Sequence, residues 1–228
     1  ASPAARYGGR RHDARGTCVA LADALPEARL RVALPVPGEP DAAVPAGFDA
    51  WSSWTASLRA PAAPETRELP FDAPIYVLYT SGTTGAPKAI RHRAGGALLR
   101  QWKELRLHGD VRAGDRVLYF TTTGWMMWNW LIAALGLGAA VVLVDGAPAW
   151  PDPLRMWRLA RDERITFFGT SARFLHGLAA ADVAPGELGL PALRTVASTG
   201  SPLSAAGFRY VYDRVASDVH LASISGGT

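Results

Sequence analysis

From residue 75 onward the chain alternates short apolar runs with longer amphipathic segments. Apolar runs of this length predict buried strands, and the amphipathic segments between them predict helices. The expected strands are 75–79, 116–120, 140–144, 166–168, 193–197 and 220–223. The expected helices are 95–108, 128–136, 153–162, 172–180 and 205–215. This alternation predicts an α/β fold with mostly parallel sheets flanked by helices.

The first third of the chain carries a weaker pattern. We expect a helix over 14–28, a short strand over 30–34 and a short helix over 51–58. Residues 35–74 are otherwise rich in proline, alanine and acidic residues, which favours loops. The composition changes near Phe71, so the chain fits one large domain or parts of two.

The most informative segment is Thr80–Lys88, which follows the apolar strand 75–79 directly. Its glycines can turn backbone N–H groups toward an anion, its hydroxyls add donors, and Lys88 adds a mobile positive charge. Its spacing differs from that of the P-loop, because two residues separate Gly82 from Gly85 and Ala89 follows the lysine. The alternative interpretation of Thr80–Lys88 is a solvated linker. The position of the segment directly after an apolar strand favours polyphosphate binding.

Three further polar segments follow predicted strands. Residues 121–130 combine threonines, a glycine, tryptophans and methionines. They fit either a threonine N-cap with an aromatic core or the wall of an acyl pocket. Residues 198–204 alone fit an ordinary turn with Ser204 as a helix cap, and 225–228 alone are uninformative. Ligand sites in parallel sheets lie beyond the carboxyl ends of strands, where 80–88, 198–204 and 225–228 are expected.

Composition narrows the classes of partner and compartment. The formal net charge is +4 without a long basic stripe, so no nucleic-acid partner is expected. The single cysteine, Cys18, excludes an internal disulfide framework and favours a reducing, cytoplasmic compartment and a buried structural thiol. The apolar stretch 130–144 is too short to span a membrane, and no membrane partner is expected. We interpret His92 and His176 as structural rather than catalytic.

Taken in order, these segments resemble the signatures of the adenylate-forming superfamily, which includes acyl-CoA synthetases, peptide-synthetase adenylation domains and luciferases. The narrower similarity is to the acetoacetyl-CoA synthetase (acetoacetate–CoA ligase) family. The similar strings are 79–90, 121–129, 151–153, 168–171, 198–203 and 223–228, with 7–9 and Trp51 also similar. The resemblance implies that residues 1–228 form part of the large N-terminal AMP-binding domain, without the mobile C-terminal domain.

The resemblance also implies a two-step reaction. ATP and a carboxylate, here acetoacetate, give an acyl-adenylate and pyrophosphate, and the thiol of CoA then releases AMP. The residues implied to bind the nucleotide are Thr80, Ser81, Gly82, Thr83, Thr84, Gly85, Lys88, Gly200, Ser201, Pro202, Gly227 and Thr228. Of these, Lys88 and Thr228 are the expected catalytic residues. The relatives also use Mg²⁺, but the expected acidic ligand follows the Thr228 position, so no metal ligand is expected within the chain.

The acyl pocket is implied to be lined by Trp125, Met126, Met127, Thr199 and Gly226. Acetyl-CoA synthetases carry a tryptophan at the position of Gly226, where it closes the pocket around an acetyl group. A glycine there leaves room for acetoacetate, and equally for another four-carbon acid.

Two alternatives to an acetoacetate–CoA ligase stay open, namely a synthetase for another short acid such as butyrate and a non-catalytic nucleotide-binding remnant. The chain has no initiating methionine and stops in a segment expected to be structured. We therefore expect a fragment, inactive alone, of a protein whose partners are small molecules. The oligomeric state stays open.

Overall fold

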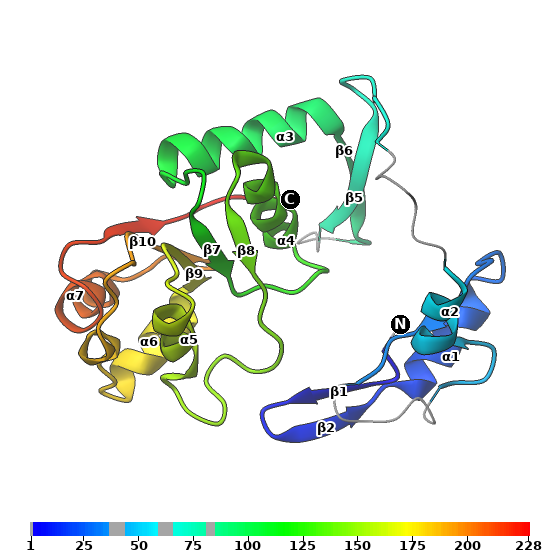
Figure 1. Ribbon diagram of the computed structural model, residues 1–228, viewed down its shortest axis with the longest axis horizontal. Helices are drawn as coiled ribbons and strands as arrows, with labels where there is room; N and C mark the ends of the chain where they lie inside the picture. The colour runs from blue at the N-terminus through cyan, green and yellow to red at the C-terminus, as the bar shows by residue number, and fades with distance from the viewer. Residues whose placement is uncertain (1, 37–43, 59–65, 81–84) are drawn as a thin grey trace. The chain divides into compact units, whose positions relative to one another are not determined.

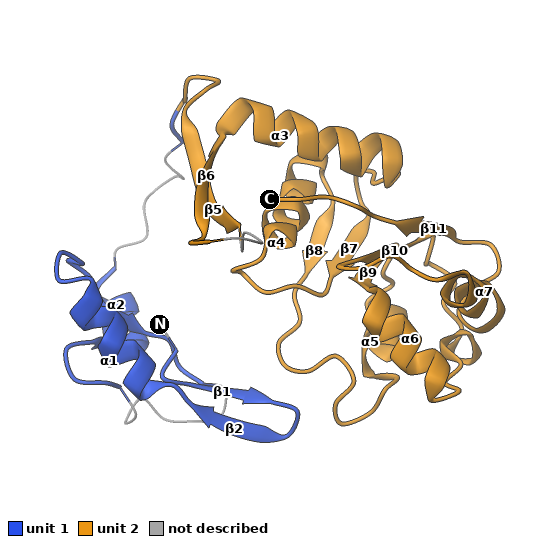
Figure 2. Cartoon of the chain, turned by 180° about the vertical axis from the view of Figure 1, so that it is seen from behind, with its two compact units in different colours: residues 1–67 blue, residues 68–228 orange. Residues whose placement is uncertain are grey.

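The computed structural model describes residues 2–36, 44–58, 66–80 and 85–228. The chain divides into two compact units, residues 1–67 and 68–228 (Figure 2). The composition change near Phe71 lies close to this boundary. The predicted phosphate-loop residues Ser81, Gly82, Thr83 and Thr84 lie outside the described residues.

The first unit is built from short elements. They are β1 (Ala4–Tyr7), β2 (Arg10–Asp13), α1 (Arg15–Ala24), β3 (Val32–Ala33), β4 (Asp49–Ala50) and α2 (Trp51–Ser57). The β1–β2 hairpin was not predicted, because β2 is charged and exposed throughout and so lacks apolar alternation. Cys18 on α1 is buried, and its thiol donates a hydrogen bond to the Ser2 carbonyl at 3.5 Å. The interpretation of Cys18 as a buried thiol is therefore confirmed.

A five-stranded, fully parallel sheet forms the centre of the second unit. Its order is β11 (His220–Ser223), β10 (Thr195–Thr199), β9 (Phe167–Ser171), β7 (Arg116–Tyr119) and β8 (Ala140–Val142). All five residues of β10 are buried, as expected for a strand covered on both faces. The predicted parallel sheet is confirmed, and its strand ends differ from the predicted ones by a few residues.

Helices cover both faces of this sheet (Figure 1). One face carries α3 (Ala94–Lys103), its π-helical continuation η2 (Glu104–His108), α4 (Met126–Ile132) and the 3₁₀ turn η3 (Ala133–Leu137). The other carries α5 (Arg155–Asp162), α6 (Ala172–Ala180) and α7 (Ala205–Arg214), with the 3₁₀ turn η4 (Pro185–Leu188) before β10. The predicted helix over 95–108 is therefore an α-helix that ends as a π-helical turn.

The sheet separates two apolar cores, because alternate residues along each strand point to opposite faces. On the α5–α7 side, Trp157 stacks on Phe168 with ring centroids 4.1 Å apart, and both are fully buried. On the α4 side, Trp130 packs against Phe167 at 5.6 Å. Burying side chains of this size contributes about 1.5–3 kcal/mol each.

Gly169 in β9 makes room for the aromatic ring of Tyr119 on β7. A Cβ atom at position 169 would lie 2.0 Å from Tyr119 Cδ2, a distance no side chain tolerates. The Tyr119 ring in turn makes an edge contact with Trp130 of α4, with centroids 5.8 Å apart. The close approach of these two strands therefore sets where the α4 indole lies.

An ion pair joins two strands at the amino end of the sheet. The Asp115 carboxylate precedes β7, is buried, and accepts hydrogen bonds from both Arg194 terminal nitrogens at 2.9 and 2.7 Å. It also accepts from the Arg112 backbone N–H at 2.7 Å. Burial alone would raise the pKa of Asp115, but these hydrogen bonds outweigh burial and hold the pKa below its ordinary value.

The predicted strand 75–79 is present as β5 (Pro74–Thr80), but it lies outside the parallel sheet. It pairs antiparallel with β6 (Lys88–Arg93), and α3 begins at the next residue. Placing this strand in the parallel sheet was wrong, and β6 was not predicted. Its sequence, Lys-Ala-Ile-Arg-His-Arg, lacks a continuous apolar run, so only its pairing with β5 marks it as a strand.

Candidate active site

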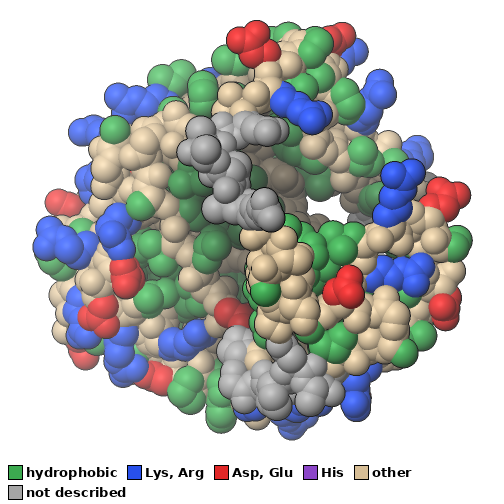
Figure 3. Space-filling view, turned by 45° about the vertical axis from the view of Figure 1, so that its right-hand side comes forward, with side chains coloured by type: hydrophobic (Ala, Val, Ile, Leu, Met, Phe, Trp, Pro, Cys, Tyr) green, Lys and Arg blue, Asp and Glu red, His purple; other side chains and the backbone are tan. Residues whose placement is uncertain are grey.

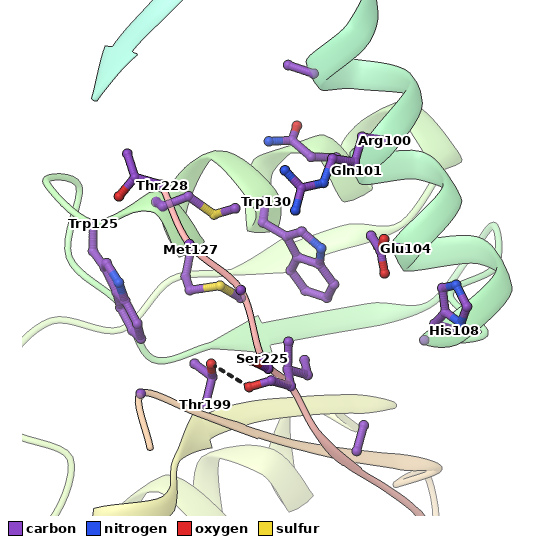
Figure 4. A pocket seen from close by; sticks show the side chains of 18 of the residues that line it. Arg100, Gln101, Glu104, His108, Trp125, Met127, Trp130, Thr199, Ser225 and Thr228 are labelled. Carbon is purple, nitrogen blue, oxygen red and sulfur yellow. Dashed lines mark hydrogen bonds between the residues drawn. The ribbon is translucent and has the colours of Figure 1, made fainter. Parts of the chain in front are cut away.

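One cavity of about 310 Å³ lies within the second unit, between α3, α4 and the segment that follows β11 (Figure 4). Its lining residues come from several elements that are distant in sequence. They are Tyr76, His92, Ala97, Arg100, Gln101, Glu104, His108, Gly109, Trp125, Met126, Met127, Trp130, Phe167, Thr199, Gly200, Ala222, Ile224, Ser225, Gly226, Gly227 and Thr228. All five predicted acyl-pocket residues line it, as do Gly200, Gly227 and Thr228.

The apolar wall of the cavity comes from the start of α4. Met127 and Trp130 are each 7 % exposed and belong to the core, while Trp125 is 38 % exposed (Figure 4). The N-cap residue is Trp125 itself, and no side chain caps the helix. The alternative of a threonine N-cap is therefore wrong. Met127 and Trp130 belong to the core and also line the cavity, because α4 both packs on the sheet and borders the cavity.

The turn after β10 forms another side of the cavity. Thr199 is 7 % exposed, and its hydroxyl donates a hydrogen bond to the Ile224 carbonyl at 3.0 Å (Figure 4). The Ile224 N–H donates to the Ser198 carbonyl at 2.7 Å. These two bonds fasten the segment 224–228 to β10. Gly200 follows with a φ of +87°, which glycine adopts without strain.

The glycine at position 226 is not required by its backbone. Its φ lies outside the left-handed region, and a Cβ atom added there would have no atom within 4 Å. A side chain at this position would therefore start in open space at the cavity. The absence of a side chain at Gly226 is consistent with a requirement for space rather than with a requirement of the turn.

A polar end of the cavity comes from α3 and from the β5–β6 hairpin, and sequence reasoning missed it. The Gln101 side-chain amide donates a hydrogen bond to the Tyr76 hydroxyl at 2.8 Å, and the Tyr76 ring packs on His92 at 4.9 Å. Burial raises the pKa of Tyr76, against a smaller lowering by the Gln101 hydrogen bond. The spacing of 97, 100, 101, 104 and 108 places these side chains on one helix face, a signal that the sequence does carry.

Three residues of the predicted phosphate loop, Thr80, Gly85 and Lys88, are among the described residues and lie at one end of the β5–β6 hairpin. Thr80 pairs directly with Lys88 across the two strands, and Gly85 and Lys88 are exposed. These three residues, together with Ser201 and Pro202, do not line the cavity. The loop thus joins two antiparallel strands, so no helix N-terminus follows it directly. Anion binding there would depend on loop N–H groups, hydroxyls and the lysine.

The segment 198–204 also stabilises the fold by capping a helix. The Ser204 hydroxyl accepts a hydrogen bond from the Gly207 N–H at 3.1 Å and caps α7, as predicted. His176 Nε2 lies 3.0 Å from the same hydroxyl, and His92 packs on Tyr76. Both histidines therefore have structural contacts.

The distribution of surface charge and of possible metal ligands is a separate feature of the described residues. Basic side chains are interspersed with acidic and apolar ones on the face shown in Figure 3. Among the described residues, no three His, Cys, Asp or Glu side chains gather as a metal site. Across the same described ranges, no helix combines the length and apolar character needed to cross a membrane. The expectation of no nucleic-acid partner stays a prediction.

Comparisons with known proteins agree with this geometry. An acetoacetyl-CoA synthetase from Gallus gallus is 49% identical over 165 residues, which cover 72% of this chain and 25% of the relative. A malonamoyl-CoA synthetase from Penicillium aethiopicum is 43% identical over 185 residues, covering 72% of this chain and 26% of that protein. The chain thus spans about a quarter of these relatives.

The fold is shared with a solved acetoacetyl-CoA synthetase from Streptomyces lividans, at 43% identity and a TM-score of 0.89. That similarity covers 100% of this chain and 35% of the solved one. The family described as AMP-binding enzyme matches residues 12–224. Because this match extends over most of the sequence, the chain belongs to the AMP-binding enzyme family.

Proposed function

We propose that this chain supplies the acid-binding pocket and part of the nucleotide site of an acetoacetate–CoA ligase. In the first step a carboxylate oxygen of acetoacetate attacks the α-phosphorus of ATP, and pyrophosphate leaves. In the second, the CoA thiol attacks the acyl carbon, and AMP leaves. Acetoacetyl-CoA synthetases are among the similar proteins, and the predicted acyl-pocket residues share one cavity.

The convergence of these residues is the observation that carries the proposal. Trp125, which precedes α4, and Met126 and Met127 of α4 line a space of about 310 Å³. Thr199 and Gly226 line the same space. A concave, mostly apolar pocket with a few polar groups is typical of small-molecule sites. The acid's tail would lie between α4 and Gly226, with its carboxylate toward Thr228.

The nucleotide would be held by the hairpin end and by the turn after β10. Lys88 would neutralise phosphate charge, and Thr80 opposite it would donate a hydrogen bond. Gly200, Ser201 and Pro202 would contact the adenine, and Gly227 and Thr228 the α-phosphate side. No general base is needed, because the attacking carboxylate is already ionised near neutral pH.

Mg²⁺ is expected as the partner of ATP, and this chain does not fit it as a resident ion. Within the described part of the chain, Glu104 is the one carboxylate that lines the cavity, and it lies 2.9 Å from the Lys103 ammonium. Mg²⁺ in nucleotide enzymes is commonly held by one or two carboxylates together with substrate phosphates. No step of the proposed reaction is therefore assigned to a metal held by these residues.

Malonamate is a second candidate substrate, because a malonamoyl-CoA synthetase is 43% identical to this chain over 185 residues. Malonamate has the length of acetoacetate, with an amide nitrogen in place of the terminal methyl. A synthetase for butyrate is the apolar alternative. CoA as the acceptor, small-molecule partners and a cytoplasmic location belong to the same proposal.

The test is acid-dependent exchange of labelled pyrophosphate into ATP by the full-length protein that contains this chain. Acetoacetate, malonamate, butyrate and acetate are compared, and thioester formation with CoA is then followed for each active acid. Highest kcat/KM with acetoacetate supports the proposal. Preference for another acid reassigns the substrate, and absence of exchange with every acid favours a non-catalytic remnant.

A further inference from the structure

The polar end of the cavity has no role in the proposed reaction. Its polar lining residues are Tyr76, His92, Arg100, Gln101, Glu104 and His108, and two of its hydrogen-bond donors are the Tyr76 hydroxyl and the Arg100 guanidinium. In Figure 4, Arg100 and Gln101 extend from α3 toward the cavity, on the side where Trp130 lies. Polar side chains at one end of a mostly apolar cavity favour a ligand whose tail carries a polar group.

Tyr76 has an unused hydrogen-bond donor. Its oxygen accepts from the Gln101 amide at 2.8 Å, and Gln101 is 7 % exposed, so the amide fixes the hydroxyl from the protein side. Within the described ranges, the hydroxyl hydrogen of Tyr76 has no acceptor. It can therefore donate to an oxygen of a ligand in the cavity.

Arg100 makes no salt bridge within the described residues, although its charge acts at longer range on Glu104 and helps to lower the pKa of that carboxyl group. Among the described residues, no carboxylate lies within 4 Å of its guanidinium, whereas the neighbouring Lys103 pairs with Glu104 at 2.9 Å. Arginine presents several N–H donors and no acceptor. Both groups at this end of the cavity therefore offer donors, and an oxygen acceptor is their complement.

Resting on the proposed function, we propose that Tyr76 and Arg100 select short acids that carry a carbonyl oxygen at the third carbon. Acetoacetate and malonamate both have this oxygen, and butyrate, of equal chain length, lacks it. Binding butyrate would remove water from both donors and leave them unpaired. Sites that hydrogen-bond a substrate group reject analogues that lack the group much more strongly than apolar pockets reject an extra methylene.

The experiment measures kcat/KM for acetoacetate and butyrate in pyrophosphate exchange by the full-length enzyme. Arg100→Met should lower the acetoacetate value about ten- to 150-fold, the usual range for a hydrogen bond to a charged group. Tyr76→Phe, which removes a neutral donor, should lower it about two- to tenfold. Both variants should raise the butyrate value, because the donor that butyrate would leave unpaired is gone, and Arg100→Lys should recover part of the acetoacetate activity.

Two matched controls separate this effect from general damage. Arg106→Met removes a cation from the η2 turn without touching the cavity. Tyr210→Phe removes a hydroxyl that donates to the Val183 carbonyl at 2.8 Å, also outside the cavity. Neither should change the ratio of the two acids, and melting temperatures show that each variant is folded.

The outcomes separate this inference from the proposed function. A fall in the acetoacetate-to-butyrate ratio confined to the Tyr76 and Arg100 variants supports it. Equal loss with both acids, or no loss, overturns it while the ligase proposal stands, because the two residues then only join the hairpin to α3. A wild-type enzyme that activates none of the acids overturns both.

Discussion

Replacing Gly226 by tryptophan tests whether empty space at this position sets the size of the acid. The structure makes the substitution informative, because an added Cβ atom meets nothing within 4 Å and φ there is not left-handed. The backbone should therefore accept the change. The indole would enter the cavity of about 310 Å³ that Met126, Met127 and Trp130 also line.

The expected size of the effect follows from filling a preformed space. Overpacking a well-packed site costs about 1–3 kcal/mol. At 1.4 kcal/mol for each factor of ten, this corresponds to roughly a five- to 150-fold loss. Acetate needs none of the space beyond its methyl group, so the loss should fall on acetoacetate and leave acetate activity nearly unchanged.

The assay is the kcat/KM for acetoacetate and for acetate in pyrophosphate exchange, measured on full-length Gly226→Trp and on Gly226→Ala. Alanine adds one methyl group in open space and should behave like the wild type. Equal loss with both acids in the tryptophan variant, or a strong effect of alanine, would refute the reasoning. Selection by size would then have to come from Met126 or Met127.

Three further changes test the nucleotide site and the fold. Lys88→Ala should lower pyrophosphate exchange about ten- to 150-fold with an unchanged melting temperature, since Lys88 is exposed, and Lys103→Ala is the matched control. Asp115→Asn should destabilise the fold by about 2 kcal/mol at neutral pH. The folded pKa of Asp115 is depressed, so the difference between wild type and variant in urea denaturation should persist above about pH 4 and shrink as pH falls through the folded pKa. Ser204→Ala should cost about 1 kcal/mol through loss of the α7 cap, and an unchanged melting temperature would contradict this.

Sequence reasoning predicted the parallel sheet because its strands are short, mostly apolar runs, such as 116–120, which forms β7 with Val117, Leu118 and Tyr119 buried. It placed β5 wrongly, because its apolar residues suggested a core strand, whereas 75, 77 and 79 are exposed. Its partner β6 is mostly polar and lacks the alternation of apolar and polar residues that predicts a strand. The acyl-pocket residues were found through a resemblance between contiguous strings. Tyr76 lies on β5, whereas Arg100 and Gln101 lie on α3, and only the tertiary fold brings the two elements to one cavity.

The contact between Gly169 and Tyr119 has a consequence for how related sequences can diverge. Any side chain larger than hydrogen at position 169 would collide with the ring at 119, so position 169 can be enlarged only where position 119 is reduced. Substitutions at the two positions are expected to occur together, an enlargement at 169 accompanied by a reduction at 119. Because the Tyr119 ring supports Trp130, such a paired exchange would also move a wall of the cavity. In an alignment of relatives, variation at this core pair should therefore follow changes in acid preference, although neither Gly169 nor Tyr119 lines the cavity.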